Sequence, residues 1–306
     1  MKRYSRDRFI FTDKLSTSCF NQQEDIVPLF YKQLESCGLD YFDFYLLHAQ
    51  NKDIFQKYKR CKAYETVFQL QKEGRIKHVG ISFHDRAEVL DEILNEYPSI
   101  EVVQIQLNYV DYDDPAVQSR LCYEVCEKHN KPVIVMEPVK GGNLANLPLE
   151  AKKYIDELHG GSPASYAIRF AMGFPNVFMV LSGMSNLSQM EDNLSFTEDF
   201  KPLIEMEKEA LKQVCKTFKS MKLIPCTACR YCVDGCPKKI MIPNLFSCLN
   251  SKKIYHDWNA NYYYSVYTKA NGKASSCIKC GKCERSCPQH LPIRSLLEEV
   301  ANEFEK

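Results

Sequence analysis

The sequence lacks the features that mark several broad classes of protein. Its 40 Lys and Arg residues nearly balance 39 Asp and Glu residues, which leaves a net charge of +1. Without an excess of positive charge, electrostatics favour neither a nucleic acid nor an anionic membrane as partner. No apolar run is long enough to span a bilayer, and residues 1–11 (MKRYSRDRFIF) lack the apolar core of a secretory signal. We therefore expect a protein that binds neither nucleic acid nor membrane.

Cysteine, in contrast, is abundant and regularly spaced. Eight of the 15 cysteines form two runs with the spacing C-x2-C-x2-C-x3-C, and a proline follows each run. This spacing is typical of the bacterial run that binds cubane iron–sulfur clusters, because thiolates three residues apart on a tight loop can reach three irons of one cube. The runs are Cys226, Cys229, Cys232 and Cys236, and Cys277, Cys280, Cys283 and Cys287.

The fourth cysteine of each run is expected to serve the other cluster. It is carried on the following turn and points away from the first three, and in two-cluster proteins it ligates the other cluster. The segment resembles the two-cluster ferredoxin module, which implies one-electron transfer at low potential. We predict one 4Fe–4S cluster on Cys226, Cys229, Cys232 and Cys287, and a second on Cys277, Cys280, Cys283 and Cys236.

Two other uses of these cysteines stay open. Paired C-x2-C units also build zinc ribbons, although zinc sites favour two close pairs over a triplet with a distant fourth ligand. A disulfide framework fits poorly in a long chain without a secretory signal. The other seven cysteines are predicted to be small buried apolar side chains. Unpaired thiols together with iron–sulfur clusters indicate a reducing cytoplasm.

The chain before the clusters alternates between short β-type runs and helical patterns. Helices are predicted to open at Asp114-Pro115 and at Ser162-Pro163, where a cap precedes a first-turn proline. Such alternation predicts a parallel sheet with covering helices. The open dinucleotide-binding sheet requires G-x-G-x-x-G, which is absent, so a β/α barrel is favoured. The six predicted strands are residues 8–12, 41–47, 76–82, 102–107, 133–137 and 177–182.

Seven segments carry a resemblance to a known family. They are RFIFTDKL, YFDFYLLHA, GRIKHVGISFH, VVQIQLNYVD, VIVMEPVKGG, SPASYAIRF and VLSGMSNLSQMEDNL. In this order, and followed by the cysteine runs, they resemble the aldo-keto reductases, and more closely the bacterial branch with a C-terminal two-cluster ferredoxin module. The resemblance implies an oxidoreductase that uses NADPH or NADH, and a small-molecule carbonyl compound as substrate.

The resemblance also implies an incomplete barrel. Residues 4–9 look like the segment before the family's third strand, so the chain would hold six of the eight units of a TIM-type barrel. The two absent units carry the family's catalytic tyrosine and an aspartate. We therefore expect an α/β fold, a partial TIM-type parallel β/α barrel plus a small α+β ferredoxin-like iron–sulfur domain. The open edges of such a barrel could pair with a second copy of the chain.

The family's functional positions fall on residues of matching type. The resemblance implies that Lys14 tunes the catalytic tyrosine and that His48 orients the carbonyl, and both are expected just past their strands. By the same resemblance, Ser82 and Gln104 would bind the carboxamide of the nucleotide, and Gly141 and Gly142 would pass near its pyrophosphate. Ser182, Asp192 and Asn193 would bind its adenosine end. Gln189 replaces a basic residue that often holds the 2′-phosphate, so the choice between NADPH and NADH stays open. These seven positions are Ser82, Gln104, Gly141, Gly142, Ser182, Asp192 and Asn193.

The chain is expected to divide into a truncated barrel at residues 1–201, a connecting helix at 202–222 and a ferredoxin-type domain at 223–306. Three hypotheses about function follow. The first is an iron–sulfur oxidoreductase that couples NAD(P)H hydride chemistry to electron transfer through two clusters. The second is a non-catalytic electron carrier between protein partners, with the barrel as a scaffold. The third is a pure fragment that needs a complementary chain, whereas a true start upstream of Met1 would favour the first hypothesis.

Overall fold

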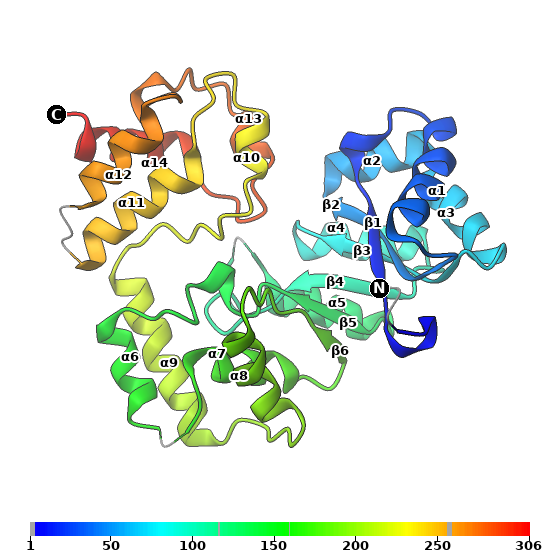
Figure 1. Ribbon diagram of the computed structural model, residues 1–306, viewed down its shortest axis with the longest axis horizontal. Helices are drawn as coiled ribbons and strands as arrows, with labels where there is room; N and C mark the ends of the chain where they lie inside the picture. The colour runs from blue at the N-terminus through cyan, green and yellow to red at the C-terminus, as the bar shows by residue number, and fades with distance from the viewer. Residues whose placement is uncertain (1–3, 116, 159, 256–258) are drawn as a thin grey trace. The chain divides into compact units, whose positions relative to one another are not determined.

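The structure, a computed structural model, describes residues 4–115, 117–158, 160–255 and 259–306 (Figure 1). The chain forms two compact units. The first unit comprises the residues up to Leu107, with Gln118–Met136 and Phe174–Leu181, and the second comprises Asn108–Val117, Glu137–Gly173 and Ser182–Lys306. Among the described helices, none combines the length and the hydropathy needed to cross a membrane.

The first unit is built on one parallel sheet whose strands follow the chain order β1 to β6. In the described residues β1 and β6 each pair on one side only, so six strands form an open part of a barrel. The predicted fold class is thereby confirmed. The strands are β1 (Thr12–Leu15), β2 (Phe42–Gln50), β3 (Ile76–Phe83), β4 (Val102–Gln106), β5 (Val133–Met136) and β6 (Val177–Val180).

The helices of this unit bury one apolar face each. In α4 (Ala87–Glu96), Leu90, Ile93 and Leu94 are fully buried, as their helical spacing predicts. The helix α1 ends at Gly38, whose left-handed φ of 65° suits a residue without a Cβ. The other helices of the unit are α1 (Ile26–Cys37), α2 (Lys52–Arg60), α3 (Ala63–Lys72) and α5 (Ser119–Lys128), with 3-10 turns at Arg6–Arg8, Thr17–Cys19 and Gln23–Asp25.

Two predicted boundaries are wrong for local reasons. The first strand begins at Thr12 instead of residue 8, because Arg6–Arg8 form a 3-10 turn whose Arg6 guanidinium lies 2.5 Å from the Asp43 carboxylate. The helix predicted to open at Asp114 begins at Ser119 instead. Asp114 accepts a hydrogen bond from the N–H of Val117 and so caps a turn. Gln118 then has a left-handed φ of 56°, which a right-handed helix cannot include, so the helix starts after it.

The neighbouring strands leave no room for a side chain at Gly80. The strand register aligns Leu46, Gly80 and Val102, and a Cβ on this glycine would lie 2.5 Å from Val102 Cγ1 and 2.7 Å from Leu46 Cδ2. We expect Gly80→Ala to lower the free energy of unfolding by about 1–3 kcal/mol through overpacking, as measured by urea unfolding. Gly183→Ala, which meets open space, is the control. An unchanged midpoint for Gly80→Ala would contradict the close packing.

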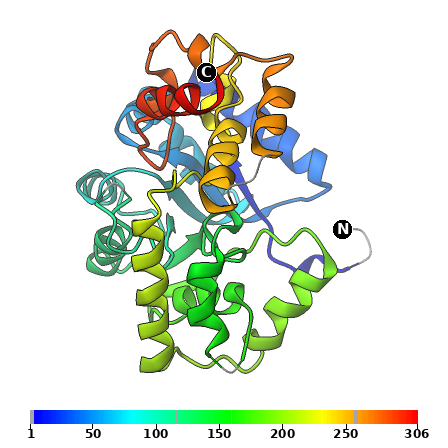
Figure 2. The ribbon, with the colours of Figure 1, turned by 90° about the vertical axis from the view of Figure 1, so that its left-hand side faces the viewer.

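The second unit begins with a group of helices around its own apolar core. The helix α7 opens at Pro163, and Ser162 accepts a hydrogen bond from the N–H of Ser165, as the sequence predicts. The helices α6 and α9 run side by side (Figure 2), and Ile155, Leu211 and Val214 pack between these helices and their neighbours. The elements are a 3-10 turn at Lys140–Gly142, α6 (Leu149–Asp156), α7 (Pro163–Met172), α8 (Leu187–Thr197) and α9 (Glu205–Ser220).

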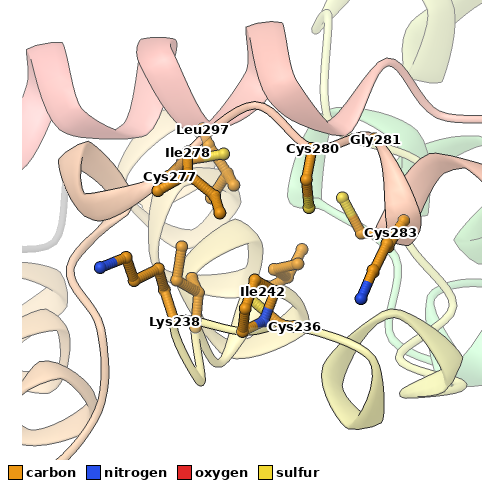
Figure 3. A pocket seen from close by; sticks show the side chains of 12 residues that line it. Cys236, Lys238, Ile242, Cys277, Ile278, Cys280, Gly281, Cys283 and Leu297 are labelled. Atoms are coloured by element: carbon orange, nitrogen blue, oxygen red, sulfur yellow. The ribbon is translucent and has the colours of Figure 1, made fainter.

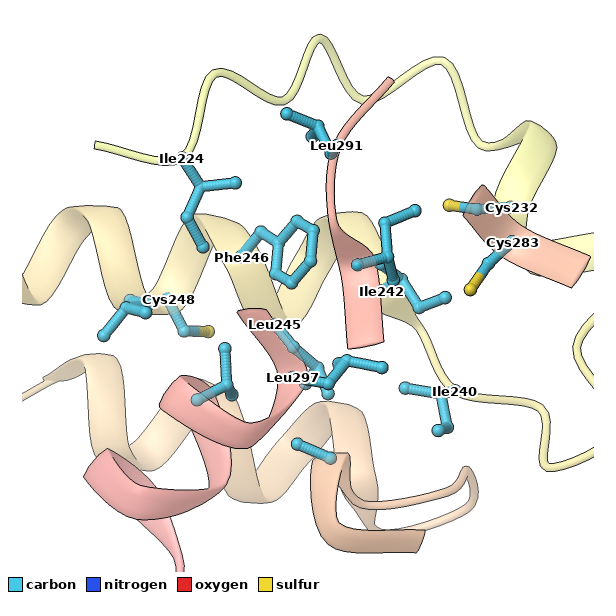
Figure 4. Close-up of a cluster of buried hydrophobic side chains, with 14 of the residues drawn as sticks. Ile224, Cys232, Ile240, Ile242, Leu245, Phe246, Cys248, Cys283, Leu291 and Leu297 are labelled. Carbon is cyan, nitrogen blue, oxygen red and sulfur yellow. The ribbon is translucent and has the colours of Figure 1, made fainter. Parts of the chain in front are cut away.

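The C-terminal part of this unit carries both cysteine runs on a helical framework. Figure 4 shows its core, where Leu245 and Phe246 of α11 meet Leu297 of α14 and Ile224, all at most 3% exposed. An isolated β-bridge joins Ile240 and Gly272. The elements are α10 (Tyr231–Asp234), α11 (Ile242–Tyr255), α12 (Asn259–Thr268), a 3-10 turn at Ala274–Ser276, α13 (Lys282–Arg285) and α14 (Ile293–Phe304).

Candidate functional site

The eight cysteines of the two runs line two separate hollows. Each hollow receives three cysteines from one run and the fourth cysteine from the other run, which is the grouping expected from the sequence. Hollow I, of about 310 Å³ with its solvent opening included, is lined by Cys226, Cys229, Cys232 and Cys287. Hollow II, of about 330 Å³, is lined by Cys277, Cys280, Cys283 and Cys236, whose side chains surround it in Figure 3.

The two cysteine loops share one backbone conformation. Counterpart residues lie 51 positions apart, since 277 − 226 = 51. Left-handed φ values occur at Ala228 and Arg230 in one loop and at their counterparts Lys279 and Gly281 in the other. These turns direct backbone N–H groups toward sulfur, as where the N–H of Lys279 lies 3.4 Å from Cys277 Sγ. Such inward N–H groups stabilise negative charge on a cluster and its thiolates.

This donor set fits a 4Fe–4S cluster in each hollow. Among the described residues no three Cys, His, Asp or Glu side chains lie close enough to share one metal ion. A cube needs wider spacing, because each thiolate binds a different iron. Burial raises the pKa of Cys226 to about 11 and that of Cys232 to about 12, so these thiols become thiolates when a metal replaces the proton.

The positions of Lys14 and His48 correct one expectation. Both lie inside strands β1 and β2, not just past them, because β1 starts later than predicted and β2 continues to Gln50. Burial, and then the charge of Lys14, lowers the pKa of His48 to about 4. Burial also lowers the pKa of Lys14, which the charge of Asp13 opposes. At neutral pH the imidazole is therefore uncharged beside a partly desolvated amine.

Two residues that the sequence did not indicate support His48. Ser16 Oγ lies 2.7 Å from His48 Nδ1. The fully buried Tyr58 hydroxyl donates to the carbonyl of Leu15 and accepts from the N–H of His48 at 3.0 Å. The position of Ser16, two residues after Lys14, is only a weak indication that it contacts His48. Tyr58 belongs to α2, and nothing in the sequence indicates that it contacts His48. The Ser16 contact holds the imidazole, and the Tyr58 hydroxyl links the backbone of β1 at Leu15 to that of β2 at His48.

The lowered pKa of His48 predicts a loss of stability in acid. The unfolded chain, with an ordinary pKa of 6.5, takes up the proton at a higher pH than the folded chain. Stability is therefore complete above about pH 6.5, falls as the pH drops, and levels off below about pH 4. In urea unfolding of the first unit across this range, we expect a steeper fall for the wild type than for His48→Gln. Equal slopes would contradict the lowered pKa.

The predicted nucleotide-binding positions of the first unit lie on one buried face of the sheet. The register pairs Ser82 with Gln104 and aligns Lys14 with Leu46 and Gly80, so these polar residues share a face. Ser82 is fully buried, and its hydroxyl accepts from the N–H of Ala49 at 2.8 Å. Gln104 Nε2 lies 3.1 Å from the sulfur of Met136. Both candidates for carboxamide binding thus already have partners within the chain.

The remaining nucleotide-binding positions belong to the second unit. Asn193 Nδ2 donates to Ser182 Oγ at 2.8 Å, and Asp192 accepts from the hydroxyl of Ser162 at 2.5 Å. Gly141 and Gly142 follow β5 with φ values of 61° and 92°. The structure therefore brings Ser182 and Asn193 together, and it places the predicted carboxamide and adenosine positions in different units.

The glycine loop after β5 contacts the first cysteine run, which the sequence did not predict. A Cβ on Gly141 would lie 2.6 Å from the carbonyl oxygen of Thr227. Asn143 Nδ2 donates to the carbonyl of Cys226 at 3.4 Å. Burial raises the pKa of Glu137, and one of its carboxylate oxygens has no described partner. A side chain at position 141 would collide with Thr227, so a glycine is needed there for this loop to lie so close to the first cysteine run.

A buried ion pair anchors the same loop. Lys140 and Asp111 are 2% and 3% exposed, and Lys140 Nζ lies 2.5 Å from Asp111 Oδ1. The fully buried Asn108 donates to the other carboxylate oxygen at 2.8 Å and to the carbonyl of Glu137 at 3.1 Å. The segments VVQIQLNYVD and VIVMEPVKGG contain these residues, but nothing in either segment indicates that they pair.

Comparison with known proteins gives two family matches. Residues 2–216 match the aldo/keto reductase family, and residues 225–292 match a 4Fe–4S dicluster domain. The glyoxal reductase of Bacillus subtilis is 29% identical over 147 residues, which are 48% of this chain and 49% of the relative. The 9,11-endoperoxide prostaglandin H2 reductase of Trypanosoma cruzi is 23% identical over 62% of each chain. The chain thus spans about half to three fifths of these curated relatives.

Solved structures agree on the fold. A thermostable aldo-keto reductase crystallised with the inhibitor epalrestat has a TM-score of 0.57 and 22% identity, over 70% of this chain and 74% of that one. An aldo-keto reductase from Klebsiella pneumoniae in complex with NADPH has a TM-score of 0.53 and 17% identity, over 68% and 70%. At these identities the likeness shows the fold.

Proposed function

Because the chain belongs to the aldo/keto reductase family and carries a 4Fe–4S dicluster domain, we propose that it is an iron–sulfur oxidoreductase that couples NAD(P)H hydride chemistry to one-electron transfer. Oxidation of one NAD(P)H releases two electrons and one proton, and two one-electron centres take up the electrons. The observation that carries the proposal is the grouping of thiols around each hollow, three from one run and one from the other.

The cysteines and their loops would hold the clusters. When bound, each 4Fe–4S cluster supplies reversible transfer of one electron. The thiolates of hollow I would be Cys226, Cys229, Cys232 and Cys287, and those of hollow II would be Cys277, Cys280, Cys283 and Cys236. Backbone N–H groups such as that of Lys279 would favour the reduced, more negative state.

Lys14 and His48 would act on a small carbonyl compound. The uncharged imidazole of His48, fixed through Nδ1 by Ser16, suits hydrogen bonding to a carbonyl oxygen without transferring charge. The ammonium of Lys14 lies near enough to influence this ring and to stabilise negative charge on oxygen. Unpaired thiols throughout the described chain suit a reducing cytoplasm.

The test uses protein purified without oxygen and loaded with iron and sulfide. We expect saturable binding of NADPH or NADH, and reduction of the clusters by the nucleotide as seen by electron paramagnetic resonance. Lys14→Ala should lower turnover at least about 100-fold without changing the iron content. Protein that holds clusters but neither binds the nucleotide nor becomes reduced by it would refute the proposal.

One observation favours the second candidate, a non-catalytic electron carrier with the barrel as scaffold. Ser82 and Gln104, the expected carboxamide contacts, are engaged by Ala49 and Met136. On this reading Lys14→Ala and His48→Ala leave electron transfer between protein partners unchanged, while Cys229→Ser abolishes it. A large loss of turnover in Lys14→Ala would exclude the carrier role.

A further inference from the structure

The 51-residue repeat of the cysteine loops lets their surroundings be compared position by position. Each hollow has a four-residue helix beside it and a Cys-Pro turn that brings its fourth thiol. Four positions of this frame differ in charge between the two hollows, and at hollow II all four are exposed. At hollow II they are Lys238, Lys239, Lys282 and Arg285, and their counterparts at hollow I are Gln289, His290, Tyr231 and Asp234.

The charges at these positions are strongly unequal. The four positions at hollow II are all cations, a charge of +4, while their counterparts at hollow I include one carboxylate and no Lys or Arg, a charge of −1 with histidine neutral. Hollow I is lined by one cation, Arg230, and the counterpart of Arg230 at hollow II is Gly281. Lys238 and Lys282 line hollow II itself, and the Arg285 guanidinium lies 3.4 Å from the place where a Cβ on Gly281 would be. None of the four cations forms an ion pair with another described residue.

Binding a cluster does not explain this difference. Both hollows present four thiolates in the same backbone frame, so both clusters would carry the same charge. If four cations were needed to balance a cluster, both hollows would need them, yet hollow I is lined by Arg230 alone among Lys and Arg residues. The local acids at hollow II are also already paired, Glu284 with Arg294 and Glu298 with Lys279. The excess of positive charge is therefore available to something outside the chain.

The two hollows also differ in what lies against them. The loop of hollow I contacts the Gly141 loop of the same unit, through Thr227 and Cys226. At hollow II the side chain of Ile278 is 56% exposed between Cys277 and the exposed Cys280. Ile278 lines hollow II together with Lys238 and Lys282. An exposed apolar side chain beside unpaired cations suits a docking surface for a partner of opposite charge.

We propose that the four cations at hollow II, together with the exposed Ile278, form the docking surface for an acidic protein that carries one electron. The proposal rests on the proposed function, since it requires a cluster in hollow II. One electron passes between the partner's redox centre and this cluster, so one is oxidised as the other is reduced, and no bond is made or broken. Hollow I, in contact with the Gly141 loop, takes the inner position.

The test replaces each of the four cations at hollow II with the residue found at the counterpart position of hollow I. The variant carries Lys238→Gln, Lys239→His, Lys282→Tyr and Arg285→Asp, which changes the charge by −5. The control, Lys216→Glu with Lys219→Glu on α9, changes it by −4 at exposed sites that line neither hollow. The probe is a flavodoxin of strongly negative net charge, reduced to its hydroquinone, and the second-order rate constant of cluster reduction is followed by stopped flow.

We expect the variant to react at least about tenfold more slowly than the wild type at low ionic strength and to lose most of the salt dependence. The control should stay within about twofold of the wild type. Equal rates and equal salt dependence for variant and wild type would overturn the proposal, and so would an equal slowing in the control.

A second reductant separates this inference from the proposed function. Photoreduced deazaflavin reaches clusters without docking, and we expect it to reduce the wild type and the charge variant equally. If deazaflavin also becomes slow with the variant, the substitutions act on the cluster and the docking inference fails. If NAD(P)H neither binds nor reduces the clusters while flavodoxin discriminates between wild type and variant, the proposed function fails and the docking surface stands.

Discussion

Cys236→Ala is expected to remove the cluster of the other run while the cluster of its own run remains. Cys236 lines hollow II with Cys277, Cys280 and Cys283, so its loss leaves that hollow with three thiolates. Iron content should fall by up to about half, because a cube that has lost a thiolate ligand sheds iron. Iron analysis and electron paramagnetic resonance of the reduced protein would measure the loss.

Double variants identify which cluster is lost. In a Cys277→Ala background, where hollow II is already incomplete, adding Cys236→Ala should cause little further loss of iron. In a Cys226→Ala background, where hollow I is incomplete, the same addition should remove the remaining cluster. Ligation within a single run would give the reverse pattern and would contradict the grouping around the hollows.

Cys248→Ala is the matched control. Cys248 is a buried thiol of α11 in the same apolar core, 5% exposed, and it lines neither hollow. Its replacement removes one sulfur and little volume, so both clusters should be retained. A loss of iron in this variant equal to that in Cys236→Ala would mean that destabilisation of the domain, and not ligation, accounts for the effect.

The sequence predicts the parts of the fold that depend on neighbours in the chain. The six strands alternate with helices, and Ser162-Pro163 opens α7, because caps and periodicity are local properties. The start of β1 was missed because it depends on Arg6 reaching Asp43, 37 residues away. That shift also moved Lys14 from beyond its strand to inside it. The division of the chain at residues 201 and 222 stays a prediction.

The same distinction applies to the candidate site. The cysteine grouping is readable because spacing within a run limits which thiols can share a cube. The partners of His48, Ser16 and Tyr58, come from other elements, and no spacing relates them. The close approach of Gly141 to Thr227 was likewise not predictable, because the two residues lie far apart in the sequence. The roles of Lys14, His48 and the nucleotide-binding residues stay predictions.

Lys140→Met is expected to cause a large loss of stability, because it breaks a buried ion pair. The change keeps the length of the side chain but removes the cation that lies 2.5 Å from Asp111. The carboxylate stays buried and keeps the hydrogen bond from Asn108, but an ionised carboxylate that has lost the Lys140 cation inside a protein is costly. We expect the free energy of unfolding of the second unit to fall by about 3–5 kcal/mol in urea.

The double variant Lys140→Met with Asp111→Asn separates the charge from the packing. It removes both charges of the pair, and it should recover much of the loss if the buried charge of Asp111 without the Lys140 cation causes it. A fall below about 1 kcal/mol in Lys140→Met alone would mean that Asp111 regains water, and the pair would then not anchor the loop.

The position of this pair in the chain gives a second measurement. Lys140 directly precedes Gly141, which contacts the Thr227 carbonyl beside Cys226. Loosening the loop should therefore release iron from hollow I at a lower urea concentration than from hollow II. Release of both clusters at one midpoint would show that the second unit unfolds as a whole. Release from hollow I first would show that two interactions stabilise the first cysteine run. They are the Lys140–Asp111 ion pair and the contact of Gly141 with Thr227.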